Sequence, residues 1–372
     1  MKPCDVLLIE PRAITQPRGG VARYIRQIAW GLHARHDAAF AICSSLNGLP
    51  PARRIQLPLR YPWRYSSPFG YHLTDMWERK LLHLAERWLK PKVVFSPFFG
   101  PLSTQTTQVF TVYDLRWQLF PDSYSSKAFV LEKRHMSRCF EHAAAIISIS
   151  EATKRDLLAI YPQLRPEKVH VILLGVASVF YSPQPLQWRK PYFLYVGNRS
   201  EPKNFARLVH AFSKSGLSGD FDLLVISPEL ESRHGFNFDE RQLIADVQLT
   251  DSIVLRVGVH DNELAAAYAG ATAFVFPSMY EGFGLPALEA LAAGTIVACS
   301  RASSLPEAGG ESAFYFNPID VDDIARTMIE TTRLSTSERT ARIADGGVHA
   351  RNHSWDVCVA KTCQLLEDVA RS

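Results

Sequence analysis

Residues 271–294 read ATAFVFPSMYEGFGLPALEALAAG and contain one complete strand-to-helix unit. The opening ATAFVFPS is a short apolar run rich in β-forming residues, which predicts a buried strand. Pro286 suits the first position of a helix, and Gly294 can end that helix after ALEALAA. A buried strand followed by a short loop and a helix is typical of a parallel α/β sheet.

Two glutamates flank the turn in this unit. Glu281 lies on the strand-to-helix loop, and Glu289 falls in the first turns of the helix. The N–H groups of Phe283, Gly284 and Leu285 are expected to be unpaired, because a helix leaves its first donors without internal acceptors. Such a place can hold an anion on its amides and a hydroxyl on each carboxylate. The stretch therefore predicts a site for a ligand that carries both phosphate and sugar.

Similar apolar runs recur along the chain with helical stretches between them. In the first half they are residues 5–9, 40–44, 93–96, 108–112, 145–149 and 169–173; in the second half they are residues 192–196, 222–226, 252–257, 272–276, 295–299 and 312–316. Continuous apolar strands that alternate with helices predict parallel sheets covered on both faces. Because 372 residues exceed one ordinary core, we expect two doubly wound domains of about six strands each.

The expected domain boundaries follow from this pattern. The N-terminal domain covers residues 1–175, a proline-containing linker residues 176–190, and the C-terminal domain residues 191–353. A terminal helix over residues 354–372 begins at a capping Ser354. In such sheets ligands bind beyond the carboxyl ends of the strands, so two facing domains would share one cleft.

Composition places the chain among globular proteins of the cytoplasm. Hydrophobic residues make up 47% and charged residues 21%, and no apolar run reaches the roughly 18 residues of a membrane span. The N-terminal stretch does not resemble a signal peptide, and the cysteines show no paired CxxC spacing, so we expect reduced thiols. Lys and Arg outnumber Asp and Glu in residues 1–186, and the reverse holds afterwards, which indicates domains with different partners.

A second loop with cations follows the strand at residues 192–196. The sequence GNRSEPKN (197–204) places Arg199 and Lys203 on one loop, with Gly197 permitting a tight exit from the strand. Next to a helix start near Asn204, two cations can neutralise a diphosphate. A solvated basic loop is the alternative, but this loop and the Glu281 loop leave the same edge of one predicted sheet, which favours the diphosphate.

Two places in the N-terminal half are further candidates. Gly19 and Gly20 follow the first strand and open a helix, without the GxGxxG spacing of a nicotinamide site. They allow close approach to a phosphate or sugar, or simply form a tight turn. Tyr113 and Asp114 end another strand, where the carboxylate can accept a hydrogen bond from a sugar or act on an acceptor hydroxyl, or cap the next turn.

The loop that begins at residue 257 reads VGVHDNELAAAYAGA. Its backbone around Val259 would lie at the same edge as the cation loop, where a nucleotide base can rest. Helix capping by Asp261 or Asn262 is the alternative, and we expect His260 to be a surface residue rather than a ligand.

Two further features have mainly structural interpretations. Ser150 is expected to cap the helix that follows it, and Glu307 in SSLPEAGGE either supports the loop or lines the cleft. No HExxH, CxxC pair, GxSxG or GxxxxGK[ST] element is present, so we expect no metal and no nucleophilic serine site.

Residues 53–92 interleave basic and aromatic side chains. A solvated loop is the default interpretation, and docking to an anionic membrane surface that carries a lipid-linked acceptor is the main alternative. Nucleic acid is not expected as a partner, because no nucleic-acid-binding motif accompanies the stretch.

These motifs resemble those of the retaining glycosyltransferases of family four. EGFGLPALE (281–289) matches the E-x7-E motif of that family, and GNRSEPKN resembles its Arg/Lys diphosphate loop. RGG (18–20), ILLGVASVFYSP (172–183), SSLPE (303–307) and the terminal SWD (354–356) resemble further family features. The resemblance covers essentially the whole chain. It implies the GT-B fold, two Rossmann-like doubly wound domains facing an interdomain cleft, with the last helix crossing back to the N-terminal domain.

The resemblance also implies individual roles. Arg199 and Lys203 would stabilise the leaving diphosphate, and Glu281 would hold the 3- or 4-hydroxyl of the sugar, so these three are the predicted catalytic residues. The predicted donor-binding residues are Gly19, Gly20, Tyr113, Asp114, Gly197, Val259, Phe283, Gly284, Leu285 and Glu289, of which Glu289 would bind the nucleotide ribose.

The donor implied by the resemblance is GDP-mannose, because EGFGLPALEA looks most like bacterial mannosyltransferases. One departure concerns the donor sugar. Many relatives have His-Asp-Leu where this chain has Tyr113-Asp114-Leu115, and that histidine usually touches the sugar near its 6-position. A 6-deoxysugar on a GDP- or dTDP-linked donor is therefore the alternative.

The expected chemistry is front-face substitution with retention. Cations and amides placed where negative charge grows on the diphosphate lower the barrier, and one such donor typically contributes roughly 3–4 kcal/mol. The nucleotide sugar is a substrate and no cofactor is expected. The acceptor would be a saccharide or a lipid-linked saccharide in surface polysaccharide assembly, reached at the cytoplasmic face of the inner membrane. A nucleotide-sugar epimerase or hydrolase, and a non-catalytic scaffold, are the rival functions.

Overall fold

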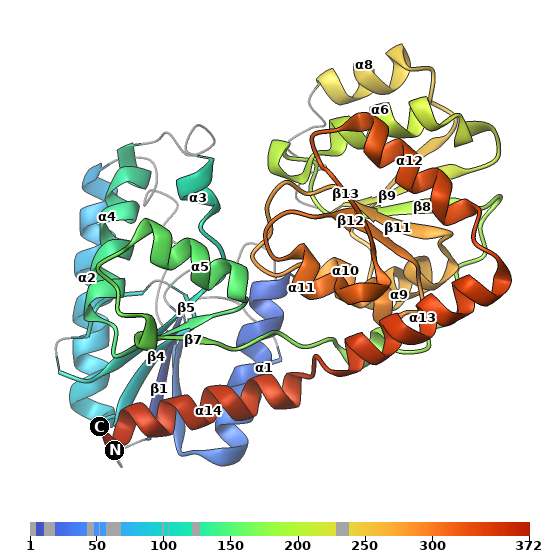
Figure 1. The fold of residues 1–372 in the computed structure, drawn as a ribbon. Coiled ribbons are helices and arrows are strands. Elements are labelled where there is room, and N and C mark those ends of the chain that lie inside the picture. The colour runs from blue at the N-terminus through green and yellow to red at the C-terminus, as the bar shows by residue number, and fades with distance from the viewer. Residues whose placement is uncertain are drawn as a thin grey trace. The chain divides into compact units, whose positions relative to one another are not determined.

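The computed structural model describes residues 5–10, 19–42, 48–51, 53–56, 68–98, 100–103, 105–120, 127–227 and 238–372. Cys4, Arg18 of the glycine loop, Cys43, the end of the strand expected at 40–44, and residues 57–67 of the basic stretch lie outside them. The chain divides into two compact units (Figure 1). The first unit is Met1–Leu174 with Trp355–Ser372, and the second unit is Gly175–Ser354.

In its described residues the first unit contains a sheet of seven strands in the order β3-β2-β1-β4-β5-β6-β7. All neighbouring strands are parallel. The strands are β1 (Val6–Glu10), β2 (Ala38–Ile42), β3 (Arg53–Gln56), β4 (Val93–Ser96), β5 (Gln108–Val112), β6 (Ala145–Ser148) and β7 (Val169–Val171). Because the order runs outward in both directions from β1 and β4, the sheet is doubly wound, and the predicted α/β class is confirmed.

The seventh strand corrects the expected count of six. Strand β3 reads RRIQ and lies at the edge of the sheet, where it pairs only with β2 among the described strands. Charged residues are common on edge strands, because one side of such a strand is not covered by a neighbour. The apolar pattern that identified the other strands is therefore missing from β3.

Helices cover the first sheet. They are α1 (Gly20–Arg35), α2 (Pro68–Leu89), α3 (Arg116–Leu119), α4 (Lys127–His142), α5 (Glu151–Ile160) and α14 (Trp355–Arg371), with a 3₁₀ turn at Pro166–Lys168. The Ser150 Oγ accepts a 3.0 Å hydrogen bond from the Thr153 N–H, so the predicted cap of α5 is confirmed. Within the described residues, no helix of either unit is long and apolar enough to cross a membrane.

The last helix packs on the first unit through α1. Trp355, Cys358 and Val359 of α14 are buried, and the rings of Trp355 and Tyr24 lie 6.4 Å apart. A Cβ placed on Gly31 of α1 would come within 2.0 Å of Val359 Cγ1. The two helices therefore approach so closely that only glycine fits at this position.

The second unit contains a parallel sheet of six strands in the order β10-β9-β8-β11-β12-β13 (Figure 1). Its strands are β8 (Tyr192–Val196), β9 (Asp222–Ser227), β10 (Ile253–Val257), β11 (Ala273–Phe276), β12 (Val297–Ser300) and β13 (Phe314–Phe316). Its helices are α6 (Phe205–Ser215), α8 (Phe238–Asp246), α9 (Asp261–Gly270), α10 (Leu285–Ala292), α11 (Leu305–Gly309), α12 (Val321–Thr332) and α13 (Thr336–Arg351), with 3₁₀ turns at Ser178–Phe180, Glu201–Lys203, Leu217–Gly219 and Gly310–Ser312.

A buried aspartate anchors the segment that leads into β8. The Asp222 carboxylate at the start of β9 accepts hydrogen bonds from Arg189 Nε at 2.6 Å and Trp188 Nε1 at 2.8 Å, and Lys190 Nζ lies 3.3 Å away. Burial alone would raise the pKa of Asp222, but the hydrogen bonds from Arg189, Trp188 and Lys190 hold it below its ordinary value. The linker segment is thus fixed to the second sheet.

Candidate functional site

The Glu281 and Lys203 loops leave neighbouring strands in the middle of the second sheet. Lys203 follows β8 and Glu281 follows β11, and these two strands pair in parallel. The strand order changes direction between β8 and β11, so the loops leave the sheet at its switch point. Open α/β sheets bind ligands at this position.

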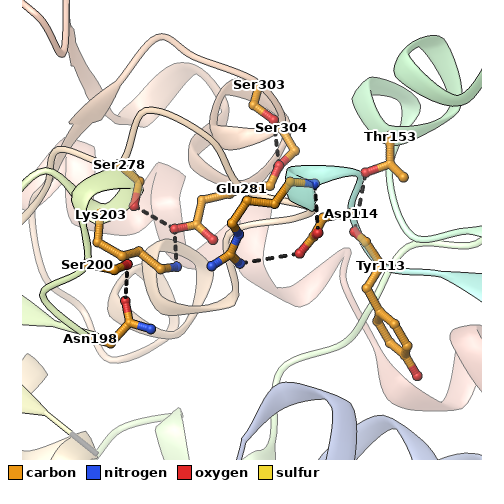
Figure 2. Close-up of polar contacts among 11 residues, drawn as sticks. Tyr113, Asp114, Thr153, Asn198, Ser200, Lys203, Ser278, Glu281, Ser303 and Ser304 are labelled. Carbon is orange, nitrogen blue, oxygen red and sulfur yellow. Dashed lines mark hydrogen bonds and ion pairs between the residues drawn. The ribbon is translucent and has the colours of Figure 1, made fainter. Parts of the chain in front are cut away.

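An ion pair joins the two loops. Lys203 Nζ lies 2.5 Å from Glu281 Oε1, and Ser278 Oγ donates to the same oxygen at 2.6 Å (Figure 2). The side chains are 14% and 9% exposed, so the pair is largely shielded from water. The sequence placed both residues at one sheet edge, and the structure brings their charges into direct contact.

Hydrogen bonds to backbone carbonyls fix the separation of the loops. Asn204 adopts a left-handed conformation with φ of 62°, and its Nδ2 donates to the carbonyls of Pro277 at 3.0 Å and Pro318 at 2.6 Å. The Met279 N–H donates to the Pro202 carbonyl at 2.8 Å. Asn204 therefore starts α6 and also holds the cation loop against the carboxylate loop.

Serines from the segment after β12 hold the backbone at Glu281. Ser303 Oγ and Ser304 Oγ donate to the Glu281 carbonyl at 2.5 and 2.8 Å (Figure 2). Ser300 Oγ donates to the Ser278 carbonyl at 2.5 Å. Glu307 and the resemblance of SSLPE to the family drew attention to this stretch, but its residues carry no signal for the serine contacts.

The start of α10 lies immediately after this loop. Gly284 has φ of 105°, and an added Cβ would lie 2.8 Å from Leu305 Cδ2 and 3.1 Å from Ala308 Cβ. Among the described residues, the N–H groups of Phe283, Gly284 and Leu285 make no backbone hydrogen bond. They lie at the start of a helix of eight residues, where amides and the helix dipole favour an anion.

Glu289 lies in α10, as expected, and is 5% exposed. Its position puts a second buried carboxylate on the same strand-to-helix unit as Glu281, which is 7% exposed. Two buried carboxylates on one unit need partners of opposite charge or donors of hydrogen bonds. Lys203 and Ser278 meet this need at Glu281.

Arg199 has a different partner from Lys203. Arg199 Nε lies 2.9 Å from Glu240 Oε2 of α8, and its guanidinium also donates to Ser227 Oγ. Its side chain is 4% exposed. Sequence reasoning did not identify Glu240, because it lies 41 residues further along in a helix without a recognisable motif.

The other predicted positions of the second unit lie around these loops. The Gly197 N–H donates to the Ile226 carbonyl at 3.0 Å, which ties the end of β8 to β9. Val259 is half-buried on the loop between β10 and α9. The expected cap of α9 needs correction: the helix begins at Asp261, the capping position is His260, and the His260 N–H donates to Glu263 Oε2 at 2.9 Å. His260 is exposed, as expected.

Burial keeps the neighbouring titratable groups neutral. The His353 ring lies 5.8 Å from the Phe283 ring, and burial lowers the pKa of His353. Burial also raises the pKa of the Cys299 thiol in β12. His353 and Cys299 therefore contribute no charge close to the switch point.

The remaining predicted site residues belong to the first unit. Gly19 and Gly20 start α1 and are half-buried. The Tyr113 ring lies 5.6 Å from the Tyr24 ring and 5.8 Å from the Phe98 ring. Asp114 Oδ1 accepts from the Arg116 N–H at 3.0 Å, and Asp114 Oδ2 lies 3.3 Å from Arg116 Nη2 (Figure 2). Asp114 thus holds the following turn, which was one of its two expected roles.

Comparison with known proteins identifies both halves of the chain. Residues 18–178 match the family described as Glycosyltransferase Family 4, and residues 182–346 match the family described as Glycosyl transferases group 1. The chain is 31% identical over 227 residues to MMP alpha-(1->4)-mannosyltransferase of Mycolicibacterium hassiacum, a match that covers 60% of this chain and 53% of that protein. It is 26% identical to O-antigen chain mannosyltransferase B of Escherichia coli, with 68% of each chain covered.

The fold has solved counterparts. Sucrose-phosphate synthase from Thermosynechococcus elongatus superposes with a TM-score of 0.79 at 19% identity and covers 100% of both chains. At this identity the likeness concerns the fold alone. Because the two family matches follow one another along the sequence, the chain belongs to the glycosyltransferases. Its first half matches family four and its second half matches group 1.

Proposed function

We propose that the protein is a retaining mannosyltransferase that moves mannose from GDP-mannose to a saccharide or lipid-linked saccharide in surface polysaccharide assembly. The relatives described above are named mannosyltransferases, and one of them acts on an O-antigen chain. The observation that carries the proposal is the Lys203–Glu281 ion pair at the switch point, next to the start of α10.

The donor would be held by three kinds of group. Glu281 would accept a hydrogen bond from the 3- or 4-hydroxyl of the sugar, and Glu289 would accept one from the ribose. The diphosphate would lie against Lys203, Arg199 and the amides of residues 283–285. An ammonium group carries three protons, so Lys203 can donate to Glu281 and to a phosphate oxygen together.

The reaction would proceed on one face of the sugar. The bond from the anomeric carbon to the diphosphate oxygen breaks, and the acceptor oxygen bonds to the same face of that carbon. The acceptor proton passes to the leaving phosphate oxygen. Lys203, Arg199 and the amides stabilise the growing negative charge, and Glu281 positions the sugar without transferring a proton.

A 6-deoxysugar on a GDP- or dTDP-linked donor is the second candidate. The feature that favours it is Tyr113, an aromatic side chain where many relatives have a histidine. Its ring packs on Tyr24 and Phe98 and is 9% exposed. An apolar aromatic ring matches a methyl group better than a hydroxyl group.

The first unit would supply the acceptor site, where Asp114 would act on the acceptor hydroxyl, while Gly19 and Gly20 stay candidate donor-binding residues. A lipid-linked acceptor requires the enzyme to work at a membrane surface, so we also propose peripheral contact of the first unit with the cytoplasmic face of the inner membrane. Lys and Arg outnumber acidic residues in this half of the sequence.

Thermal denaturation with GDP, UDP or dTDP tests the nucleotide. A ligand at a hundred times its Kd stabilises a protein by about 2.7 kcal/mol, which gives a readable shift. Stabilisation by GDP alone supports the proposal. A preference for UDP or dTDP contradicts GDP-mannose and leaves glycosyl transfer intact. If the protein consumed GDP-mannose without an acceptor as fast as it transfers mannose, a hydrolase or epimerase would be favoured instead. If none of the three nucleotides shifted the unfolding temperature, a non-catalytic scaffold would be favoured.

A further inference from the structure

The outer face of α2 is unusually apolar. Phe69, Met76, Trp77, Leu84 and Trp88 are 73%, 43%, 50%, 43% and 58% exposed. Their spacing along the helix places them on one side, because residues three, four, seven and eight apart share a helical face. Large apolar side chains that gather on one exposed face mark an interaction surface.

The described part of the fold leaves this face exposed. On the opposite side of α2, Leu82, Ala85 and Leu89 are buried against β1, β2 and β4 in the core of the first unit. Helix α4 packs beside α2 (Figure 1). The helix is therefore apolar on two sides, and only one side is needed to hold it in place.

Positive and negative side chains of α2 differ in their exposure. Lys80 and Arg87 are exposed, whereas Glu78 and Glu86 are buried. The remaining acid, Asp75, has an 18% exposed side chain and pairs with Arg79 at 3.0 Å. The exposed face thus combines large apolar side chains with two positive charges for which no ion pair is found among the described residues, and Lys80 Nζ lies 5.8 Å from the centre of the Trp77 ring.

We infer that the outer face of α2, made of Phe69, Met76, Trp77, Lys80, Leu84, Arg87 and Trp88, docks the first unit on an anionic lipid surface. A helix that lies in a membrane interface buries its apolar side chains at the headgroup boundary and places basic side chains at anionic headgroups. Tryptophan is well suited to this boundary, because its ring is apolar and its N–H can still reach water.

A second copy of the chain fits this face less well. A twofold dimer through α2 would bring the Lys80 and Arg87 side chains of both copies into one interface, and like charges in an interface are costly. The lipid surface supplies the opposite charge. The inference rests on the membrane contact of the first unit proposed above and names the surface that makes it. It does not depend on the donor, since lipid binding can be measured without a nucleotide sugar.

Sedimentation of the full chain with vesicles tests the inference. The vesicles contain phosphatidylethanolamine with phosphatidylglycerol, or phosphatidylcholine alone. We expect the protein to bind the phosphatidylglycerol vesicles, less at high salt, and to bind phosphatidylcholine weakly. The double variants Trp77→Ser with Trp88→Ser, and Lys80→Glu with Arg87→Glu, should each lower the partition coefficient about tenfold or more.

Matched changes elsewhere serve as controls. Ile319→Ser removes an apolar side chain that is 65% exposed in the second unit. Arg155→Glu with Arg165→Glu reverses two exposed charges of the first unit away from α2. Both control variants should bind vesicles as the wild type does.

Three outcomes would overturn the inference. The first is no binding to phosphatidylglycerol vesicles, and the second is equal loss in the control and α2 variants. The third is a concentration-dependent doubling of mass that the tryptophan variants abolish without any change in vesicle binding, which would assign the face to a dimer. Because two independent pairs of residues are changed, misfolding of one variant does not leave the inference untested.

Discussion

Lys203 Nζ contacts Glu281 Oε1 at 2.5 Å, so the cation expected at the diphosphate and the carboxylate expected at the sugar form one ion pair. The two residues lie 78 positions apart and come from the loops after β8 and β11. A charge pair at this place keeps both groups fixed before a ligand arrives. Such preorganisation reduces the rearrangement needed during the reaction.

Removal of Lys203 should affect stability and activity separately. Lys203→Ala should lower kcat by at least about tenfold, because a donor to the leaving group is lost. It should also lower the free energy of unfolding by about 3 kcal/mol, since Glu281 remains buried with only Ser278 as its described donor. Denaturant unfolding and turnover measure the two effects.

The double variant Lys203→Met with Glu281→Leu separates the two roles. It should recover much of the lost free energy of unfolding, because an apolar pair can replace a buried ion pair, and it should stay inactive. Turnover close to the wild type in the double variant would show that the pair is purely structural.

The partner of Arg199 should compete with the donor. Arg199 Nε lies 2.9 Å from Glu240 Oε2, so a diphosphate must share or replace that contact. Arg199→Ala should lower kcat at least about tenfold. Glu240→Gln should lower the Kd for GDP about threefold or more, because the guanidinium loses its pairing with this carboxylate. Calorimetric titration checks this, and weaker GDP binding in Glu240→Gln would mean that Glu240 orients Arg199 instead.

Gly284→Ala should impair the start of α10. Its φ of 105° is strained for alanine, and the new Cβ would lie 2.8 Å from Leu305 Cδ2. We expect a loss of about 2 kcal/mol in the free energy of unfolding, together with weaker GDP binding. Gly216→Ala is the matched control, since Gly216 has φ of 70° with no atom within 4 Å of an added Cβ. The control should lose stability and bind GDP as tightly as the wild type does. If Gly284→Ala also bound GDP as tightly as the wild type, the amides of residues 283–285 would not belong to the site.

Gly31→Ala tests the packing of the last helix on α1. Alanine normally stabilises a helix by about 1 kcal/mol relative to glycine. Here the added Cβ would lie 2.0 Å from Val359 Cγ1, so we expect a loss of about 1–3 kcal/mol in the free energy of unfolding. In a Val359→Ala background the same change should become neutral or stabilising. A stabilising effect in the wild-type background would contradict the close approach of α1 and α14.

The hydrogen bonds between Asp222 and the linker residues 188–190 should make the free energy of unfolding depend on pH in the acid range. Since hydrogen bonds hold its folded-state pKa below the ordinary value of 3.8, its contribution is complete above about pH 4 and is lost as the pH falls through the folded-state pKa. Asp222→Asn should lower the free energy of unfolding by about 1–3 kcal/mol at pH 7, with a smaller difference from the wild type below pH 4. Denaturant unfolding at pH 7 and pH 3 measures both, and a constant difference would rule out this role.

The sequence predicted the sheets well because their strands are buried on both faces. Residues 192–196 and 273–276 are continuous apolar runs, and both form strands in the centre of the second sheet. Strand β3 was missed because its two arginines break that pattern at the sheet edge. Apolar runs report burial, and an edge strand with one open side gives little of that signal.

The site was predictable only to the level of its loops. Sheet-edge reasoning placed Lys203 and Glu281 on adjacent loops, because the carboxyl ends of parallel strands meet at one edge. It could not find the Arg199–Glu240 contact or the left-handed Asn204, since side-chain partners and backbone conformation depend on tertiary packing. The serines that hold the Glu281 carbonyl have no sequence pattern that distinguishes them from ordinary turn residues.

Titration of GDP and GDP-mannose into the wild type and Glu281→Gln tests the central claim most directly. We expect the wild type to bind both ligands, and Glu281→Gln to bind GDP with a similar Kd while binding GDP-mannose at least about tenfold more weakly, because only the sugar contacts this carboxylate. An equal Kd for GDP-mannose in both proteins, or no binding of GDP-mannose to the wild type, would contradict the assignment of Glu281 as the group that holds the donor sugar.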